Sequence, residues 1–181
     1  MKHKITTKRI TTTAVLSAMS ALMFMVEGLF PPLFLPGAKM GLSNAFSLFA
    51  LFASGAADGF AVVFVRVIVG NIVAGNLSSM LYGLSAGLAS MLVAAYLRQF
   101  VYPKISIVAV SVVSAVVHNT TQCVVYCVLS NTPQMVGYLP YLVVLGVVAG
   151  LVVGISVWIA LKSISVSFFV GLKDSRGFVD E

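Results

Sequence analysis

Long apolar segments joined by short links constrain this chain more than any other feature. A helix that crosses a bilayer needs about 20 mainly apolar residues. The candidate segments cover residues 10–30, 42–57, 59–74, 79–97, 105–129 and 138–161. Only 9% of the residues are charged and 60% are apolar, whereas a soluble domain carries about 25% charged residues. We therefore expect an all-α integral membrane protein with six transmembrane helices.

The second and third segments are short for spanning helices. They are separated by residues 55–59, Gly-Ala-Ala-Asp-Gly, whose glycines and single acid are typical of a tight turn. Two interpretations stay open for this region: two full spans or a re-entrant pair. In either case the chain forms a single membrane domain, with polar tails at residues 1–9 and 162–181.

The distribution of positive charge predicts the orientation. If the N-terminus is cytoplasmic, all Lys and Arg residues except Lys39 and Arg66 lie in cytoplasmic parts of the chain, as the positive-inside rule requires. This supports six spans with both termini cytoplasmic, and we expect a multi-pass protein of a cell membrane, namely the plasma membrane of a bacterium. The net charge of +6 does not indicate nucleic-acid binding, because the positive residues sit at segment ends and form no stripe with interleaved aromatics.

Small residues recur every four positions in three segments. Gly146, Gly150 and Gly154 do so in the sixth, and such spacing places small side chains on one helix face, where backbones approach closely. Gly83 and Gly87 of the fourth segment show the same spacing, so we expect packing within the chain for both segments. In the first segment the matching residues are alanines, and their face suits either internal packing or docking of a partner protein.

Ionisable groups at membrane depth are few, and each is informative. They cost about 2.5–3.5 kcal/mol apiece on insertion scales and usually face a cavity or one another. Glu27 lies late in the first segment, and Lys39 lies in the first outer loop. Arg66 is inside the third segment, and His118 is central in the fifth.

The fifth segment carries the clearest polar face. Ser111, Ser114, His118 and Gln122 follow at spacings of three and four, so they share one side of a helix, with Asn119 adjacent. One interpretation is hydrogen bonding between helices that fixes the bundle. For His118, Asn119 and Gln122 we favour a cavity, because three such side chains within five residues exceed what one helix contact needs.

The first outer loop, residues 31–39, is stiffened by prolines and is largely apolar. It suits a lid over a site in the outer half of the bundle, or a segment resting on the lipid interface. In such a site Lys39 and Arg66 would meet an anionic group, and Glu27 would pair with either of these cations or with a positive group of the substrate. The predicted substrate-binding residues are Glu27, Lys39, Asn44, Arg66, His118, Asn119 and Gln122. Cys123 and Cys127 complete no metal-ligand set, and we expect no metal and no cofactor.

Several motifs resemble one known family. Residues 36–44, Pro-Gly-Ala-Lys-Met-Gly-Leu-Ser-Asn, are similar to the Pro-Gly-x-Lys-x-Gly-Leu-x-Asn signature of the heptaprenyl diphosphate synthase component I family, also named the Gx transporter family. Arg66 follows at the family's separation, and residues 82–88 form a similar Gly-rich run. Residues 114–122 resemble the family's Gly-Ala-x-x-His-Asn-x-x-Gln run, with Ser114 in place of the glycine. The resemblance covers residues 11–161.

That family in turn resembles the S components of energy-coupling factor (ECF) transporters. The resemblance implies a six-helix protein that captures a vitamin or related compound on the outer side. It also implies that an alanine motif on the first helix docks on a transmembrane T component driven by two ATPases, and Ala14 and Ala18 match that spacing. The implied mechanism is capture in the outer half followed by toppling of the whole subunit.

The resulting prediction is a substrate-binding, S-like component of an ATP-driven importer, for a small molecule such as a vitamin, a flavin, or an isoprenoid or quinone precursor. The alternative is a non-catalytic membrane subunit associated with a prenyl diphosphate synthase. We do not expect an enzyme, because Asp58, Asp174 and Asp180 are isolated and cannot hold magnesium against a diphosphate. No phosphate-binding Gly-x4-Gly-Lys-Ser/Thr run is present either, so energy would come from partners. A scaffold role would leave the polar cluster around His118 unexplained.

Overall fold

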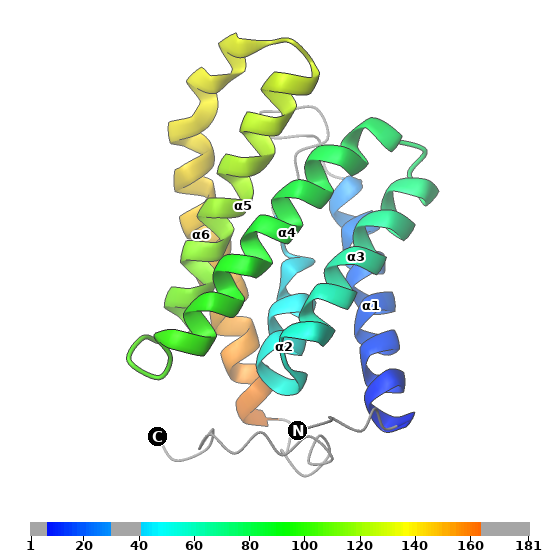
Figure 1. The fold of residues 1–181 in the computed structure, drawn as a ribbon, viewed down its shortest axis with the longest axis vertical. Helices are drawn as coiled ribbons and strands as arrows, with labels where there is room; N and C mark the ends of the chain where they lie inside the picture. Colours follow the sequence, from blue (N-terminus) through cyan, green and yellow to red (C-terminus); the bar gives the residue numbers. More distant parts are fainter. Residues whose placement is uncertain (1–6, 30–40, 164–181) are drawn as a thin grey trace.

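The computed structural model describes residues 7–29 and 41–163, and in these ranges the chain is helical with short links and contains no strand. The expected all-α class is confirmed. Figure 1 shows the helices running up and down in one bundle. In chain order they are α1 (Thr7–Gly28), α2 (Asn44–Ser54), α3 (Ala56–Val73), α4 (Leu77–Phe100), α5 (Ile107–Leu129), the 3-10 helix η1 (Pro133–Tyr138) and α6 (Leu139–Ser163).

In the described part of the chain, five helices are long and apolar enough to cross a bilayer: α1, α3, α4, α5 and α6 with η1. A sixth span is not confirmed. α2 has 11 residues, which at 1.5 Å per residue make about 16 Å, roughly half of a hydrocarbon core. Its residues 47–52 are all buried, so α2 is a short helix packed among the others. α3, with 18 residues, is long enough to span.

The link between α2 and α3 is tighter than the predicted turn over residues 55–59. Only Gly55 separates the two helices, with φ at +113°, a backbone conformation that L side chains rarely adopt. Asp58 therefore lies in the first turn of α3, where a negative charge is favoured by the helix dipole. The helix begins early because a single glycine is enough to reverse the chain.

Two other helix starts differ from the predicted ones because a polar side chain caps the helix. α4 begins at Leu77, since the Asn76 side chain accepts a hydrogen bond from the Ser79 N–H at 3.0 Å. α5 begins at Ile107, since the Ser106 hydroxyl accepts one from the Ala109 N–H at 3.1 Å. In both, the cap satisfies one of the N–H groups that a first turn leaves without an internal partner.

The glycine face of α6 packs on α5, as the spacing predicted. A Cβ added at Gly150 would lie 2.6 Å from the Cα of Val112, and one at Gly154 would lie 2.7 Å from the Cα of Val108. One at Gly146 would lie 3.1 Å from the Cα of Val116. These glycines therefore let two backbones meet, which is the close approach that small residues permit in membranes.

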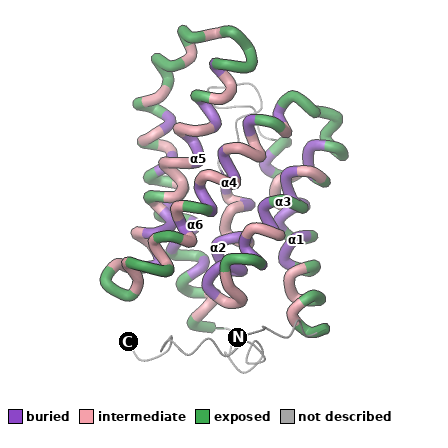
Figure 2. Tube along the Cα trace, in the orientation of Figure 1, coloured by how far each residue is buried: buried purple, intermediate pink, exposed green. Residues whose placement is uncertain are grey.

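The outer surface of the bundle is apolar, and Figure 2 shows exposed residues on α1, α3, α4, α5 and α6, whereas α2 has none. Large side chains such as Leu22, Leu92 and Ile159 are more than half exposed, as expected for a lipid-facing surface. α1 contacts α2 and α3, α4 lies between α3 and α5, and α6 contacts α5 and α2. Several apolar helices of this kind make a multi-pass membrane protein.

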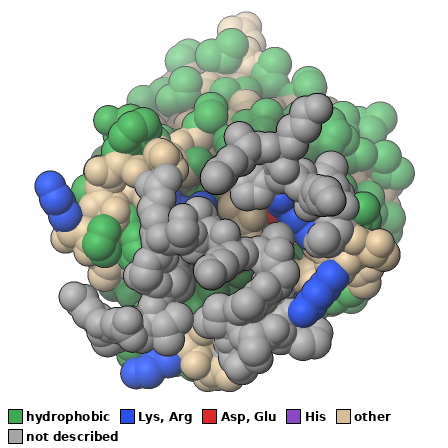
Figure 3. All heavy atoms as spheres, turned by 60° about the horizontal axis from the view of Figure 1, so that its bottom comes forward, with side chains coloured by type: hydrophobic (Ala, Val, Ile, Leu, Met, Phe, Trp, Pro, Cys, Tyr) green, Lys and Arg blue, Asp and Glu red, His purple; other side chains and the backbone are tan. Residues whose placement is uncertain are grey.

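Positive charge gathers at one end of the bundle. α1 starts and α6 finishes at this end, which Figure 3 shows with Lys and Arg side chains around its rim. Among the described residues, Lys8, Arg9, Arg98, Lys104 and Lys162 lie there, in or beside the ends of α1, α4 and α6. By the positive-inside rule this end is predicted to be cytoplasmic. The cytoplasmic placement of the termini stays a prediction.

Candidate functional site

A chain of hydrogen bonds joins a buried acid to a buried base across three parts of the fold. The Arg66 Nη1 of α3 donates to the Ser43 hydroxyl at 2.9 Å and to the Asn44 side-chain oxygen at 2.7 Å. The Ser43 hydroxyl donates to the Glu27 carboxylate of α1 at 3.0 Å. The Leu42 N–H donates to the other oxygen of that carboxylate. Glu27 and Arg66 are thereby linked through Ser43, and Arg66 also binds a third predicted site residue, Asn44.

Burial makes this network obligatory. Arg66 is 2% exposed and Glu27 is 7% exposed, and a buried charge is tolerated only when it is paired and hydrogen-bonded. The ion pair that the structure records within its described part joins Arg9 to Asp58, so Glu27 and Arg66 communicate through the Ser43 hydroxyl. The sequence predicted that Glu27 would pair with a cation, and the structure makes that pairing indirect.

The segment before α2 is shaped to present Ser43 and Asn44 inward. The Asn44 N–H donates to the Gly41 carbonyl at 2.9 Å, which closes a turn just before the helix. Gly41 has φ at +82°, and a Cβ there would lie 2.8 Å from the Asn44 amide nitrogen. Glycine is required at position 41 both for the backbone conformation and for the space that Asn44 fills. Ser20 of α1 anchors the same segment, since its hydroxyl donates to the Ser43 carbonyl at 2.9 Å.

α5 brings His118 and Gln122 to the same place. They line a cavity of about 20 Å³ together with Glu27, Asn44 and Arg66, and we call it the charged cavity. Two buried nitrogens on its walls, the Arg66 Nε and the His118 Nδ1, have no hydrogen-bond partner among the described residues. Unpaired buried polar atoms are rare in folded proteins, so these two nitrogens mark the cavity as a candidate site.

Asn119 is placed apart from the other predicted residues. Its amide nitrogen donates to the Leu142 carbonyl of α6 at 2.9 Å, and it lines neither cavity that the structure describes. It therefore fixes the α5–α6 contact, which is the packing role that the sequence left open for this polar face. Lys39 lies outside the described residues. Ala14 and Ala18 are exposed on α1, so their face is not used for packing in the described part of the chain.

Sequence reasoning missed Ser43, Asn71 and Ser79, which also line the charged cavity. The Ser79 hydroxyl donates to the Asn71 side-chain oxygen, and the Asn71 amide donates to the Val67 carbonyl at 2.7 Å. Asn71 is a hydrogen-bonding side chain within an apolar segment, so the argument applied to Arg66 and His118 would have found it. Ser43 precedes Asn44 directly, and no spacing distinguishes it from the other serines of the chain.

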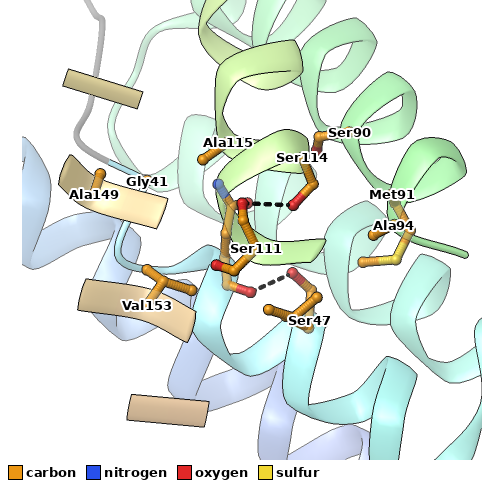
Figure 4. A pocket seen from close by; sticks show the side chains of 12 residues that line it. Gly41, Ser47, Ser90, Met91, Ala94, Ser111, Ser114, Ala115, Ala149 and Val153 are labelled. Carbon is orange, nitrogen blue, oxygen red and sulfur yellow. Dashed lines mark hydrogen bonds between the residues drawn. The ribbon is translucent and has the colours of Figure 1, made fainter. Parts of the chain in front are cut away.

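A second cavity lies beside the first, between α2, α4, α5 and α6. It measures about 30 Å³, and we call it the serine cavity because serines of three helices line it. Figure 4 shows Ser47, Ser90, Ser111 and Ser114 around it, with Met91 and Val153 among its apolar neighbours. Each cavity has room for one or two water molecules. Gly41 and Asn44 belong to the walls of both.

Among the described residues, neither cavity has the set of side chains that a metal ion needs. Within residues 7–29 and 41–163, no three His, Cys, Asp or Glu side chains are grouped to hold an ion. What the charged cavity offers is hydrogen-bonding groups: a guanidinium N–H, an imidazole nitrogen and the side-chain amide of Gln122. A set of this kind is suited to hydrogen bonding with a ligand.

Comparison with known proteins gives one match. A family model described as heptaprenyl diphosphate synthase component I matches residues 16–160. No curated protein and no solved structure matches the chain. The matched model spans every described helix from within α1 to within α6, so it includes all residues of both cavities.

Proposed function

Because the chain belongs to the heptaprenyl diphosphate synthase component I family, we propose that it is a membrane-embedded component that binds a small molecule for other subunits to act on. The family is that of a non-catalytic subunit associated with the synthase, so the chain is not itself an enzyme. The family also implies a partner subunit, the second component of the synthase. In the function proposed, the charged cavity receives the ligand.

The observation that carries the proposal is the buried Arg66. A guanidinium in the interior of a membrane protein is expensive and marks a functional site by default. Here one edge of it is bound by Ser43 and Asn44, and the Nε has no partner among the described residues. A purely structural arginine would be expected to use its donors in full.

For the biological role we propose a substrate-binding S-like component of an ATP-driven ECF-type importer, whose substrate is a vitamin, a flavin, or an isoprenoid or quinone precursor. The exposed small face at Ala14 and Ala18 supports this role, because it leaves α1 free to meet a T component and, through it, two ATPases. The proposed binding residues are Glu27, Asn44, Arg66, His118 and Gln122. Lys39 lies outside the described residues and stays a predicted binding residue, and Asn119 is assigned to helix packing.

The second candidate is a membrane subunit of a prenyl diphosphate synthase, and the family description favours it. In that role the chain would hold a ligand or a lipid-soluble product beside a catalytic partner. The charged cavity fits either role, because both require a hydrogen-bonding site inside the membrane. The two candidates differ in the partner that each requires.

Co-purification from the native membrane tests the role. We expect the tagged chain to bring down a T component and its ATPases, and we expect Ala14→Leu with Ala18→Leu to release them while the chain itself stays folded. A control with Val15→Leu, a more conservative change on the same exposed helix, should retain them. Recovery of a soluble prenyl synthase subunit in their place would establish the second candidate. Recovery of neither set of partners would refute both roles.

A further inference from the structure

The two cavities meet at one residue pair. Gly41 and Asn44 line both, and the Asn44 side chain stands between Arg66 on one side and the serines on the other. Among the described residues, the Asn44 side-chain oxygen accepts one hydrogen bond, of 2.7 Å, from Arg66, and this side chain stands where the two cavities adjoin.

One face of α5 runs past both cavities in sequence order. Ser111 and Ser114 line the serine cavity, and His118 and Gln122 line the charged cavity. These residues follow at spacings of three and four, so they form a continuous polar stripe along the helix. From Ser111 to Gln122 the stripe extends about 16 Å, at 1.5 Å per residue. A ligand that reached from one cavity into the other would contact this stripe in both.

The charged cavity and the serine cavity, at the two ends of the stripe, differ in chemistry. At the charged end, the Arg66 Nε and the His118 Nδ1 are buried and have no partner within the described residues. At the other end the serine donors are already used, because Ser47, Ser90 and Ser114 each donate to a carbonyl of their own helix. These three serines therefore offer a ligand no free hydroxyl donor. Apolar side chains such as Met91 and Val153 line the rest of the serine cavity.

We infer that the two cavities are one binding site for a bipartite ligand, with an oxyanion head at Arg66 and His118 and a slender, mostly apolar body in the serine cavity. This rests on the proposed function and adds the class of ligand. The head competes with Asn44 for the Arg66 guanidinium, and the Asn44 amide then turns away and opens the passage. Asn44 thereby selects for ligands whose head is strong enough to displace it.

The test compares a short and a long probe with the same head. The full chain in lipid nanodiscs is titrated with acetate and with butyrate, and empty nanodiscs serve as the blank. Methyl phosphate and propyl phosphate repeat the comparison with the other common oxyanion. We expect the long probe of at least one series to bind about tenfold more tightly than the short one, because its two further methylene groups bury apolar area. Arg66→Gln should abolish binding of both.

Ala149→Leu places a larger side chain in the wall of the serine cavity. We expect it to remove the advantage of the long probe and to leave the short probe within about twofold of the original chain. Val148→Leu, on the exposed side of the same helix, is the matched control and should change neither. If Ala149→Leu does not fold, Ser90→Ala decides, since it makes the wall more apolar and should favour the long probe by about threefold.

Equal affinity of the long and short probes, or an affinity ratio that neither Ala149→Leu nor Ser90→Ala changes, would overturn the inference. Binding of the short probes through Arg66 would in that case leave the proposed function standing. Failure of both oxyanion series to bind the original chain would also overturn it, and the co-purification result would then decide the proposed function separately.

Discussion

The first three helices and the α5–α6 pair are held together by opposite means. α1, the start of α2 and α3 are joined through Glu27, Ser43 and Arg66, whose side chains meet in hydrogen bonds inside the bundle. α5 and α6 are joined by glycines that bring backbone against backbone, with Gly150 at the closest point. The first contact depends on polar side chains that form hydrogen bonds, and the second depends on glycines that lack a Cβ atom. The two regions should therefore fail, and recover, under different substitutions.

The largest effect is expected from Arg66→Met. The change leaves the Glu27 carboxylate buried without its cation, and breaking one side of a buried charge pair typically costs about 3–5 kcal/mol. Thermal unfolding in mild detergent measures the loss. Adding Glu27→Gln to Arg66→Met should recover most of the stability, because a buried pair replaced on both sides is often close to neutral. A double variant as unstable as Arg66→Met alone would show that the network is not what joins these helices.

The second effect is expected from Gly150→Ala. The added methyl would lie 2.6 Å from the Cα of Val112, and overpacking of this kind costs about 1–3 kcal/mol. Val112→Ala should give no rescue, since the clash is with the backbone. The matching case on α4 is Gly87→Ala, whose methyl would meet the Val63 side chain at 2.8 Å.

For Gly87→Ala, the second substitution Val63→Ala should restore stability, because here the obstacle is a side chain that can be shortened. Gly137→Ala is the control, since a Cβ at that position meets nothing within 4 Å. Each comparison uses thermal unfolding of the same preparation. Rescue of Gly150→Ala by Val112→Ala would show that the α5–α6 backbones are not in the close contact described.

The sequence predicted the parts of the fold that depend on periodicity. Every expected apolar segment contains a helix, and the glycine spacing of α6 identified its packing face. It did not give the length of α2, because an apolar run of spanning composition does not reveal where the helix inside it begins. Gly41 and the Asn44 turn start that helix inside the bundle, and this depends on contacts with α1 and α3 that are distant in sequence.

For the candidate site, the cost of burying an ionisable group identified residues that lie around one cavity, and the spacing of polar residues did so less well. Glu27, Arg66 and His118 were singled out for that cost and lie around one cavity. Asn119 was grouped with His118 because it is adjacent in sequence, yet neighbours on a helix point about 100° apart, and its amide bonds to α6. Ser43 carries no signal of its own, because its role comes from standing between two charges.

A smaller effect is expected at the opposite end of α1 and α3. Asp58 accepts hydrogen bonds from the Arg9 Nε at 2.7 Å and from the Thr13 hydroxyl at 3.0 Å. Only 14% of the Arg9 side chain and 11% of the Asp58 side chain are exposed. Asp58→Asn should cost about 1 kcal/mol, because the amide keeps the shape of the side chain and part of its hydrogen bonding. Added salt should change this cost little, because buried charges are screened much less than exposed ones. Lys104→Gln, at the same end, is the control and should leave the unfolding temperature in place.

The smallest effect on stability separates the two neighbours His118 and Asn119. Asn119→Ala removes the hydrogen bond to the Leu142 carbonyl, and such bonds between membrane helices average about 0.6 kcal/mol. Probe binding at Arg66 should not change, because Asn119 lines neither described cavity. His118→Ala should weaken binding of the short oxyanion probes, because it removes the imidazole from the wall of the charged cavity. Unfolding and titration of both variants provide the measurement.

If Asn119→Ala impaired binding as much as His118→Ala, the polar face of α5 would act as one unit, and the division between a packing side and a binding side would be wrong.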